Sequence, residues 1–114
     1  MTMRRFCSAV VGAAALLVSS NASAVYNANM SGVVTELMTY ADGDYIYLRL
    51  SAQPATHPSC LTAYFVIPAS VPADRRKAMF AQLMVAKLTG EPINLGYDNA
   101  GDCADGYIRV HRVG

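Results

Sequence analysis

Three residues that could do chemistry at a surface alternate along one short segment: Tyr45, Tyr47 and Arg49. Alternate residues of a β-strand point to the same face, so these side chains would share a surface while the apolar residues between them face a core. A tyrosine presents an aromatic ring with a hydroxyl group, and an arginine presents a planar array of donors. The combination suits sugar stacking or a protein interface, although half-exposed tyrosines on an ordinary sheet would give the same pattern.

The N-terminal residues 1–24 are typical of a secretory signal peptide. Two arginines precede an uncharged apolar run, residues 6–18, and Ala22-Ser23-Ala24 fits the small-x-small pattern of a signal-peptidase site. The apolar run has about 13 residues, whereas a membrane span needs about 20. We therefore expect cleavage after Ala24, no membrane span in the mature chain, and a secreted or periplasmic protein.

Removal of the leader would leave two cysteines, Cys60 and Cys103. In an oxidising compartment two thiols most simply pair, and closing a loop of about 44 residues would stabilise a small domain by about 4 kcal/mol. A redox or nucleophilic cysteine is the weaker alternative, because the sequence has no CxxC motif. Seven basic residues would then stand against eight acidic ones, so the chain lacks the positive charge expected of a nucleic-acid-binding protein.

Three carboxylates, Asp98, Asp102 and Asp105, fall within one loop and could supply oxygen ligands to calcium. Their spacing does not match an EF-hand loop, and turn formation alone explains aspartate, asparagine and glycine in such a segment. We therefore assign no metal site. The sequence also lacks HExxH and GxSxG motifs, so we predict no catalytic residue, no cofactor and no enzymatic activity.

The hydrophobic pattern predicts five strands and one helix. Gly32 offers a place for a bend in the first strand, and Asp42-Gly43 indicates a tight hairpin turn before the second. We expect Leu61 of the third strand to face the core, together with a helical stripe that includes Met84, Val85 and Leu88. The strands are expected at residues 29–40, 45–50, 61–67, 93–97 and 107–113, and the helix at residues 72–89.

The order β-β-β-α-β-β is that of the OB-fold, a partly open five-stranded barrel. A three-stranded sheet and a hairpin packed on one helix would give the same order. We expect an all-β fold with one helix, arranged as a five-stranded OB-fold-like barrel that spans residues 25–114 as a single domain. Its last strand would present Tyr107, Arg109 and His111 outward, which fits a solvated sheet face or a second binding surface.

The first expected strand contains Ser31-Gly32-Val33-Val34, the entry to the second contains Gly43-Asp44-Tyr45, and the helix exit reads Thr89-Gly90-Glu91-Pro92-Ile93. These segments resemble the pentameric B subunit of subtilase cytotoxin and the related OB-fold B subunits of exported bacterial toxins. The resemblance implies ring formation and glycan binding, and it matches the family's sugar-contacting serine to Ser31. The chain has no tryptophan and no aromatic insertion after the fourth strand, so the family's sugar pocket would be incomplete.

These patterns lead to two hypotheses about function. The first is an exported, non-enzymatic binding module similar to a toxin B subunit, which can form a homo-oligomer and recognises a glycan or a protein surface. Its candidate ligand-binding residues are Ser31, Tyr45, Tyr47 and Arg49. The second is a periplasmic inhibitor or stress-related interaction domain that uses the same face against one protein partner. A neighbouring gene for an exported enzymatic subunit would favour the first.

Overall fold

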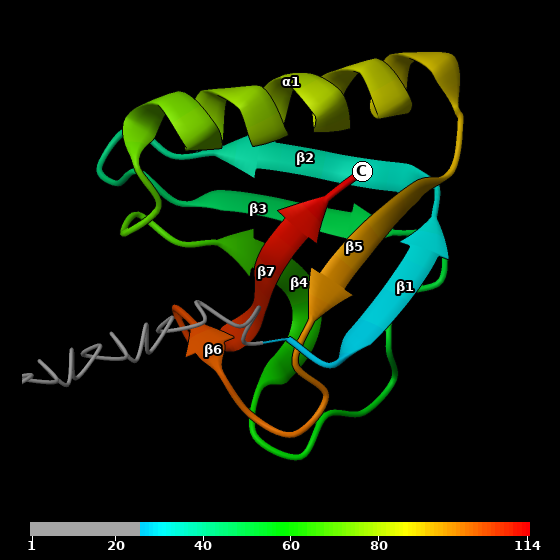
Figure 1. Ribbon diagram of the computed structural model, residues 1–114, viewed down its shortest axis with the longest axis vertical. Helices are drawn as coiled ribbons and strands as arrows, with labels where there is room; N and C mark the ends of the chain where they lie inside the picture. Colours follow the sequence, from blue (N-terminus) through cyan, green and yellow to red (C-terminus); the bar gives the residue numbers. More distant parts are fainter. Residues whose placement is uncertain (1–25) are drawn as a thin grey trace, which may run out of the picture.

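A computed structural model describes residues 26–114, so the predicted leader and its cleavage site lie outside the described residues. Strands lie on both sides of one long helix in the sequence (Figure 1). Within residues 26–114, no helix has the length and apolar character needed to cross a membrane. The elements are β1 (Ala28–Gly32), β2 (Val34–Thr39), β3 (Ile46–Leu50), β4 (Leu61–Ile67), α1 (Ala73–Thr89), β5 (Ile93–Tyr97), β6 (Cys103–Ala104) and β7 (Tyr107–Val113).

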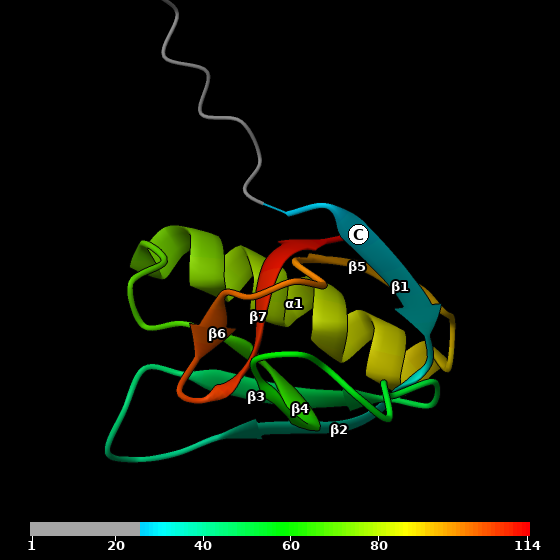
Figure 2. The ribbon, with the colours of Figure 1, turned by 90° about the horizontal axis from the view of Figure 1, so that it is seen from below.

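The strands form one sheet with the hydrogen-bonded order β1-β5-β7-β4-β3-β2, and β6 pairs with β7. The pair β4 and β7 is parallel, and the other pairs are antiparallel. The strands at the two ends of this order, β1 and β2, are consecutive in the chain and are separated only by Val33. Figure 2 shows β2, β3 and β4 on one side of the molecule and β1, β5 and β7 on the other.

The chain turns from β1 into β2 where a small residue is needed. A Cβ atom on Gly32 would lie 3.1 Å from the Cβ of Leu50, so a larger residue would push these segments apart. Val33 donates its N–H to Ser51 Oγ at 3.0 Å and accepts the Ser51 N–H at 2.8 Å, which keeps its backbone groups paired. The bend predicted at Gly32 is therefore seen, one residue later.

The core lies between the two sides of the sheet and α1. β3 shows the predicted alternation, with Ile46, Leu48 and Leu50 buried and the residues between them half-buried. The strands β2, β4, β5 and β7 add buried apolar side chains to the same cluster, α1 adds two, and β1 adds only the partly buried Met30. The cluster includes Val34, Phe65, Ile67, Leu83, Ala86, Ile93, Leu95, Ile108 and Val110.

The helix α1 is buried along one narrow side. Leu83 and Ala86 are its buried residues, and Gly90 ends it in the left-handed conformation with its N–H bonded to Ala86 O at 2.9 Å. The prediction that Val85 and Leu88 face the core is wrong. They lie two and five positions after Leu83, and in a helix with 3.6 residues per turn such positions project to the opposite side. Val85 and Leu88 are 60% and 82% exposed.

The prediction of an all-β fold with one helix is confirmed, but the sheet has seven strands where five were expected. The first expected strand is broken at Val33, and β6 adds a short strand within a segment expected to be a loop. Leu61 is 61% exposed, not buried. The register of β4 against β7 shifts between Leu61 and Phe65, and an irregularity of this kind re-aims the side chains before it.

The predicted two-residue turn at Asp42-Gly43 is also wrong. Residues 40–45 connect β2 to β3, and neither Asp42 nor Gly43 has the positive φ angle that a tight hairpin turn requires. The hairpin itself is present, since β2 and β3 pair in antiparallel fashion. The longer connection leaves Tyr45 outside the strand, at the entry to β3.

The predicted disulfide between Cys60 and Cys103 is present, with 5.6 Å between the two Cα atoms. It joins the loop before β4 to β6. His57, in the loop before β4, is half-buried and reinforces this connection. Its Nδ1 accepts the N–H of Cys60 at 2.9 Å, so Nε2 carries the proton and donates to Asp98 O at 2.8 Å.

Candidate functional site

Tyr47 stands at the centre of a group of tyrosines on the outer side of the sheet. Its ring centroid lies 5.1 Å from that of Tyr40 and 6.1 Å from those of Tyr64 and Tyr107, with the rings nearly perpendicular. Edge-to-face contact is a favoured geometry for aromatic pairs. The group, called the tyrosine surface below, consists of Tyr40, Tyr45, Tyr47, Tyr64 and Tyr107 together with Asp105.

A tight turn places Asp105 against Tyr47. Asp105 and Gly106 join β6 to β7, and both have positive φ angles, 50° and 80°. Positive φ at both central residues defines the type I′ hairpin turn that Asp-Gly sequences favour. Tyr47 Oη donates a hydrogen bond to Asp105 Oδ2, so this turn fixes a carboxylate next to the central tyrosine.

The electrostatic effect of this contact falls on the Tyr47 hydroxyl group. The hydrogen bond to Asp105, followed by burial and by the negative charge of Asp105, raises the pKa of Tyr47 from 10.0 to about 12. Each of these effects favours the protonated phenol over the phenolate. At neutral pH Tyr47 is therefore a neutral donor that is held in one orientation.

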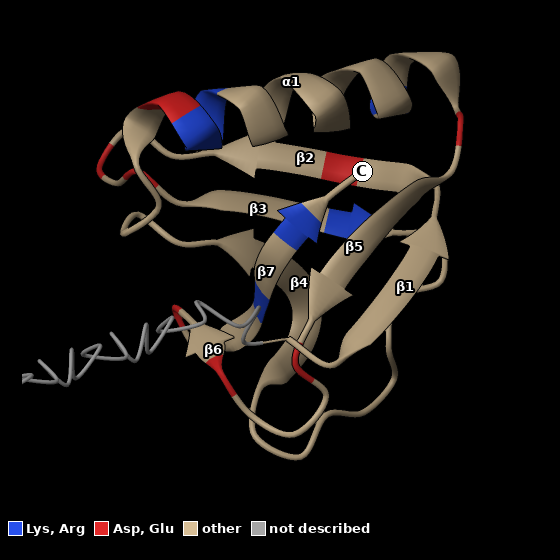
Figure 3. Cartoon of the chain, viewed as in Figure 1, with Lys and Arg blue, Asp and Glu red and all other residues tan. Residues whose placement is uncertain are grey.

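A hollow of about 210 Å³ opens at the edge of the tyrosine surface. Its lining combines aromatic rings with two carboxylates, those of Asp42 and Asp105, and includes no lysine or arginine. Figure 3 shows these acidic segments in red, in the connection between β2 and β3 and beside β6. Such a lining suits an uncharged ligand with hydroxyl groups, and it opposes a phosphate or other anion. The complete lining is Tyr40, Asp42, Gly43, Tyr45, Tyr47 and Asp105.

Arg49, the third residue of the predicted trio, lies two residues beyond Tyr47 on β3. It is half-buried, as its predicted place on the outer face requires. Its partner in the sheet register is Glu36 of β2, and its backbone oxygen accepts the Thr35 hydroxyl at 3.3 Å. Arg49 thus shares the face of Tyr47, but it does not line the hollow, which is formed by the connection between β2 and β3.

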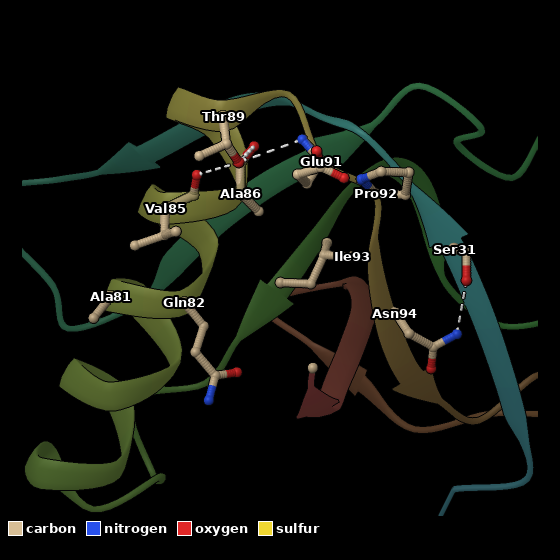
Figure 4. Close-up of a pocket in the computed structure, with 11 residues that line it drawn as sticks. Ser31, Ala81, Gln82, Val85, Ala86, Thr89, Glu91, Pro92, Ile93 and Asn94 are labelled. Carbon is tan, nitrogen blue, oxygen red and sulfur yellow. Dashed lines mark hydrogen bonds between the residues drawn. The ribbon is translucent and has the colours of Figure 1, made fainter.

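A larger hollow of about 760 Å³, called the helix-side hollow below, lies between α1 and β5 (Figure 4). Its walls are mostly apolar. Ser31 lies at its rim on β1, where its Oγ accepts a hydrogen bond from Asn94 Nδ2 at 2.8 Å. Figure 4 shows this pair across the hollow from the helix. The apolar wall residues include Ala81, Val85, Ala86, Pro92 and Ile93.

The structure therefore divides the four predicted ligand residues. Tyr45 and Tyr47 line one hollow, Arg49 lies beside them on β3, and Ser31 lines the other hollow. Tyr40, Tyr64 and Asp105 belong to the tyrosine surface and were not predicted. The Asp105-Gly106 dipeptide between two short apolar segments is the sequence signal that would have located the carboxylate.

The three carboxylates considered as calcium ligands have separate partners. Asp98 Oδ1 accepts the N–H of Ala100 at 3.0 Å, Asp102 contacts Arg109 and His111, and Asp105 accepts from Tyr47. No group of three or more histidine, cysteine, aspartate or glutamate side chains converges among residues 26–114 in a way that could hold a metal ion.

Comparisons with known proteins add no relative. No protein-family model matches the chain, no curated protein matches its sequence, and no solved structure matches its fold. The resemblance to toxin B subunits, and the sugar contact that it implies for Ser31, stay predictions. The case for a function therefore depends on the geometry of the tyrosine surface and of the helix-side hollow.

Proposed function

We propose that this chain is an exported, non-enzymatic binding module, similar to a toxin B subunit, and that its ligand is a carbohydrate bound at the tyrosine surface. The observation that carries the proposal is the group of tyrosines around Tyr47, with the Asp105 carboxylate fixed among them. The disulfide supports export, because disulfides persist mainly in oxidising compartments.

The chemistry of the tyrosine surface favours a neutral sugar over other ligands. The apolar face of a sugar ring can pack on a tyrosine ring, while its hydroxyl groups bond to tyrosine hydroxyls and carboxylate oxygens. Asp42 and Asp105 would repel the phosphates of a nucleic acid. Tyr40 is 54% exposed, so at least one ring presents a large area to a ligand.

The sheet connectivity supports placing the chain in the OB-fold class. If β1 and β2 are counted as two halves of one bent strand, five long strands remain, and that strand pairs with β5 through β1 and with β3 through β2. The helix follows the third of these strands, as in an OB-fold, a fold that commonly binds oligosaccharides. This connectivity leads us to propose an OB-type barrel for the described residues.

A glycan array followed by titration of the bound sugars tests the carbohydrate proposal. We expect binding of neutral oligosaccharides, and we expect Tyr40→Ala to weaken the affinity about tenfold, or about 1.4 kcal/mol. Leu88→Ala is the matched control, because it also truncates an exposed apolar side chain but lies on α1. Absence of binding across the array, or equal losses in the two variants, would overturn the proposal.

A protein-interaction domain is the second candidate, and the exposed side of α1 favours it. Met84, Val85 and Leu88 are 45%, 60% and 82% exposed, and Val85 also lines the helix-side hollow. Contiguous exposed apolar residues often mark a protein contact. Leu88→Asp would then abolish co-purification of a periplasmic partner, or self-association measured by sedimentation, and leave sugar binding unchanged. Normal association by this variant would exclude the helix as the contact.

A further inference from the structure

A third hollow, of about 290 Å³, lies between the start of α1 and the outer side of β7. Basic side chains reach it from two elements: Arg75 from the first turn of the helix, and Arg109 and His111 from alternate positions of the strand. Ser70, in the loop before the helix, adds a hydroxyl group. Figure 3 shows basic segments in blue at the start of α1 and along β7. We call this site the basic hollow.

One carboxylate organises the strand side of the basic hollow. Asp102 Oδ2 contacts His111 Nε2 at 2.5 Å, and Asp102 Oδ1 lies 3.5 Å from Arg109 Nη1. The side chains of His111 and Arg109 are 13% and 33% exposed, so both are held in place and still reach solvent. Tyr26 stacks on His111, with 6.0 Å between the ring centroids, and further restricts that ring.

The charges of the basic hollow do not cancel. Asp102 supplies one negative charge against the two guanidinium groups of Arg75 and Arg109, and the Nε2 of His111 is already bonded to Asp102. Among the described residues, Arg75 makes no ion pair. The acidic neighbour of Arg75 in the sequence, Asp74, does not line the hollow. An unpaired arginine next to a partly neutralised one leaves a positive potential focused in a concave site.

We propose that the basic hollow binds an oxyanion, meaning a carboxylate, phosphate or sulfate group carried by a ligand. Guanidinium groups bind such anions through paired N–H donors, and Arg109 uses only one of its donors on Asp102. The Ser70 hydroxyl can donate an additional hydrogen bond. The site differs from the hollow of the tyrosine surface, where carboxylates line the wall, and the inference does not rest on the proposed carbohydrate function.

Titrations of inorganic phosphate, sulfate and acetate into ¹⁵N-labelled protein at constant ionic strength test the inference. At least one anion should give saturable amide shifts centred on Ser70, Arg75 and His111, and the three arms show which oxyanion is preferred. Shifts that rise linearly without saturation, or that spread over the whole surface, would mean that the basic hollow is not a site.

Charge-matched variants show whether the site depends on its own arginines. Arg75→Gln should raise the dissociation constant of the preferred anion at least tenfold, and Arg109→Gln should have a similar effect. Lys77→Gln removes the same charge from the same helix but lies in a different hollow, so we expect less than a twofold change. Equal weakening by Arg75→Gln and Lys77→Gln would indicate general charge attraction and overturn the inference.

Folding and independence have separate controls. Arg75 is exposed, so its variant should keep the melting temperature of the native protein even if Arg109→Gln, which removes a partner of Asp102, does not. Tyr47→Phe should leave anion binding unchanged, because Tyr47 does not line the basic hollow. If Tyr47→Phe abolished anion binding while the protein stayed folded, the anion would be bound at the tyrosine surface and the inference would be wrong.

Discussion

The tyrosine surface and the helix-side hollow are built in different ways. Asp105 and Tyr47 are fixed by a tight turn and a hydrogen bond, and the disulfide ends only two residues before Asp105. The helix-side hollow is larger and mostly apolar, and the hydrogen bond between Ser31 and Asn94 lies at its rim. The first region is organised in advance for a small polar ligand, whereas the second offers mainly apolar area.

The largest effect is expected from removal of the disulfide, which lies beside the tyrosine surface and not beside the helix-side hollow. Replacing both Cys60 and Cys103 by alanine removes a link across 43 positions of the chain, which should lower the free energy of unfolding by about 4 kcal/mol. Urea denaturation measures this loss.

The same double variant should also lose sugar affinity, because Cys103 anchors the turn that carries Asp105. Contacts made through Leu88 on α1 should change less, provided that the variant is studied well below its melting temperature. If sugar binding survived while the helix contacts were lost, the disulfide would support the other region and the comparison would be reversed.

A pair of leucine variants tests how firmly α1 is held on its two sides. Leu83 is fully buried and Leu88 is 82% exposed. Leu83→Ala should cost about 3 kcal/mol, since it leaves a cavity beneath the helix, whereas Leu88→Ala should change stability by less than about 0.5 kcal/mol. Thermal and urea unfolding compare the two. A large loss from Leu88→Ala would show that its side chain is covered in solution.

The raised pKa of Tyr47 makes the stability of the tyrosine surface depend on pH, whereas the helix-side hollow, as lined by the described residues, has no such contact. Its pKa is about 12 in the folded protein against 10.0 for an ordinary tyrosine, so its contribution to stability is fully present below pH 10. That contribution is lost as the pH rises from 10 to 12, because only the unfolded chain has released the proton in this range.

Spectrophotometric titration of the phenolate absorbance should resolve one late-titrating tyrosine. Asp105→Asn should move its pKa back toward 10, since the carboxylate is both the hydrogen-bond acceptor and the nearby charge. Tyr47→Phe serves as the control that removes the late transition. If Asp105→Asn left the transition near 12, the side chain of Asp105 would not be the cause.

The smallest effect is expected at Ser31. Ser31→Ala removes one exposed acceptor of Asn94, so stability should change by less than about 0.5 kcal/mol. Sugar affinity should stay within twofold of the native value, because Ser31 does not line the hollow of the tyrosine surface. A clear loss of sugar binding would move the carbohydrate site to the helix-side hollow and support the toxin resemblance.

Local patterns in the sequence predicted those parts of the fold that depend on neighbouring residues. The alternation in β3, the Gly90 end of α1 and the pairing of the two cysteines all follow from residue type and spacing. Asp42-Gly43 and Asp105-Gly106 carry the same turn signal, yet only the second forms the tight turn. Ala104 pairs with Tyr107 directly across the second dipeptide, whereas the nearest pair around the first is Thr39 with Ile46. A dipeptide does not encode where strand pairing stops.

The tyrosine surface could be predicted only in part. Tyr45 and Tyr47 share one segment, but Tyr40, Tyr64 and Tyr107 reach them through the sheet order β7-β4-β3-β2. That order depends on a parallel pair that no short pattern reveals. The exposed residues of α1 were misassigned for a related reason: a helix with apolar residues on most sides does not show which side the sheet will cover.

The parallel pairing of β4 with β7 also has a consequence for how the chain folds. The two strands are separated by α1, β5 and β6, so their pairing has to wait for Tyr107–Val113, and the Cys60–Cys103 bond has to wait for Cys103. Contacts between distant segments slow folding, because the intervening chain must be ordered first. The described fold therefore remains incomplete until β7 is available, and oxidation of the cysteines would hold β6 beside β4 once Cys103 is in place.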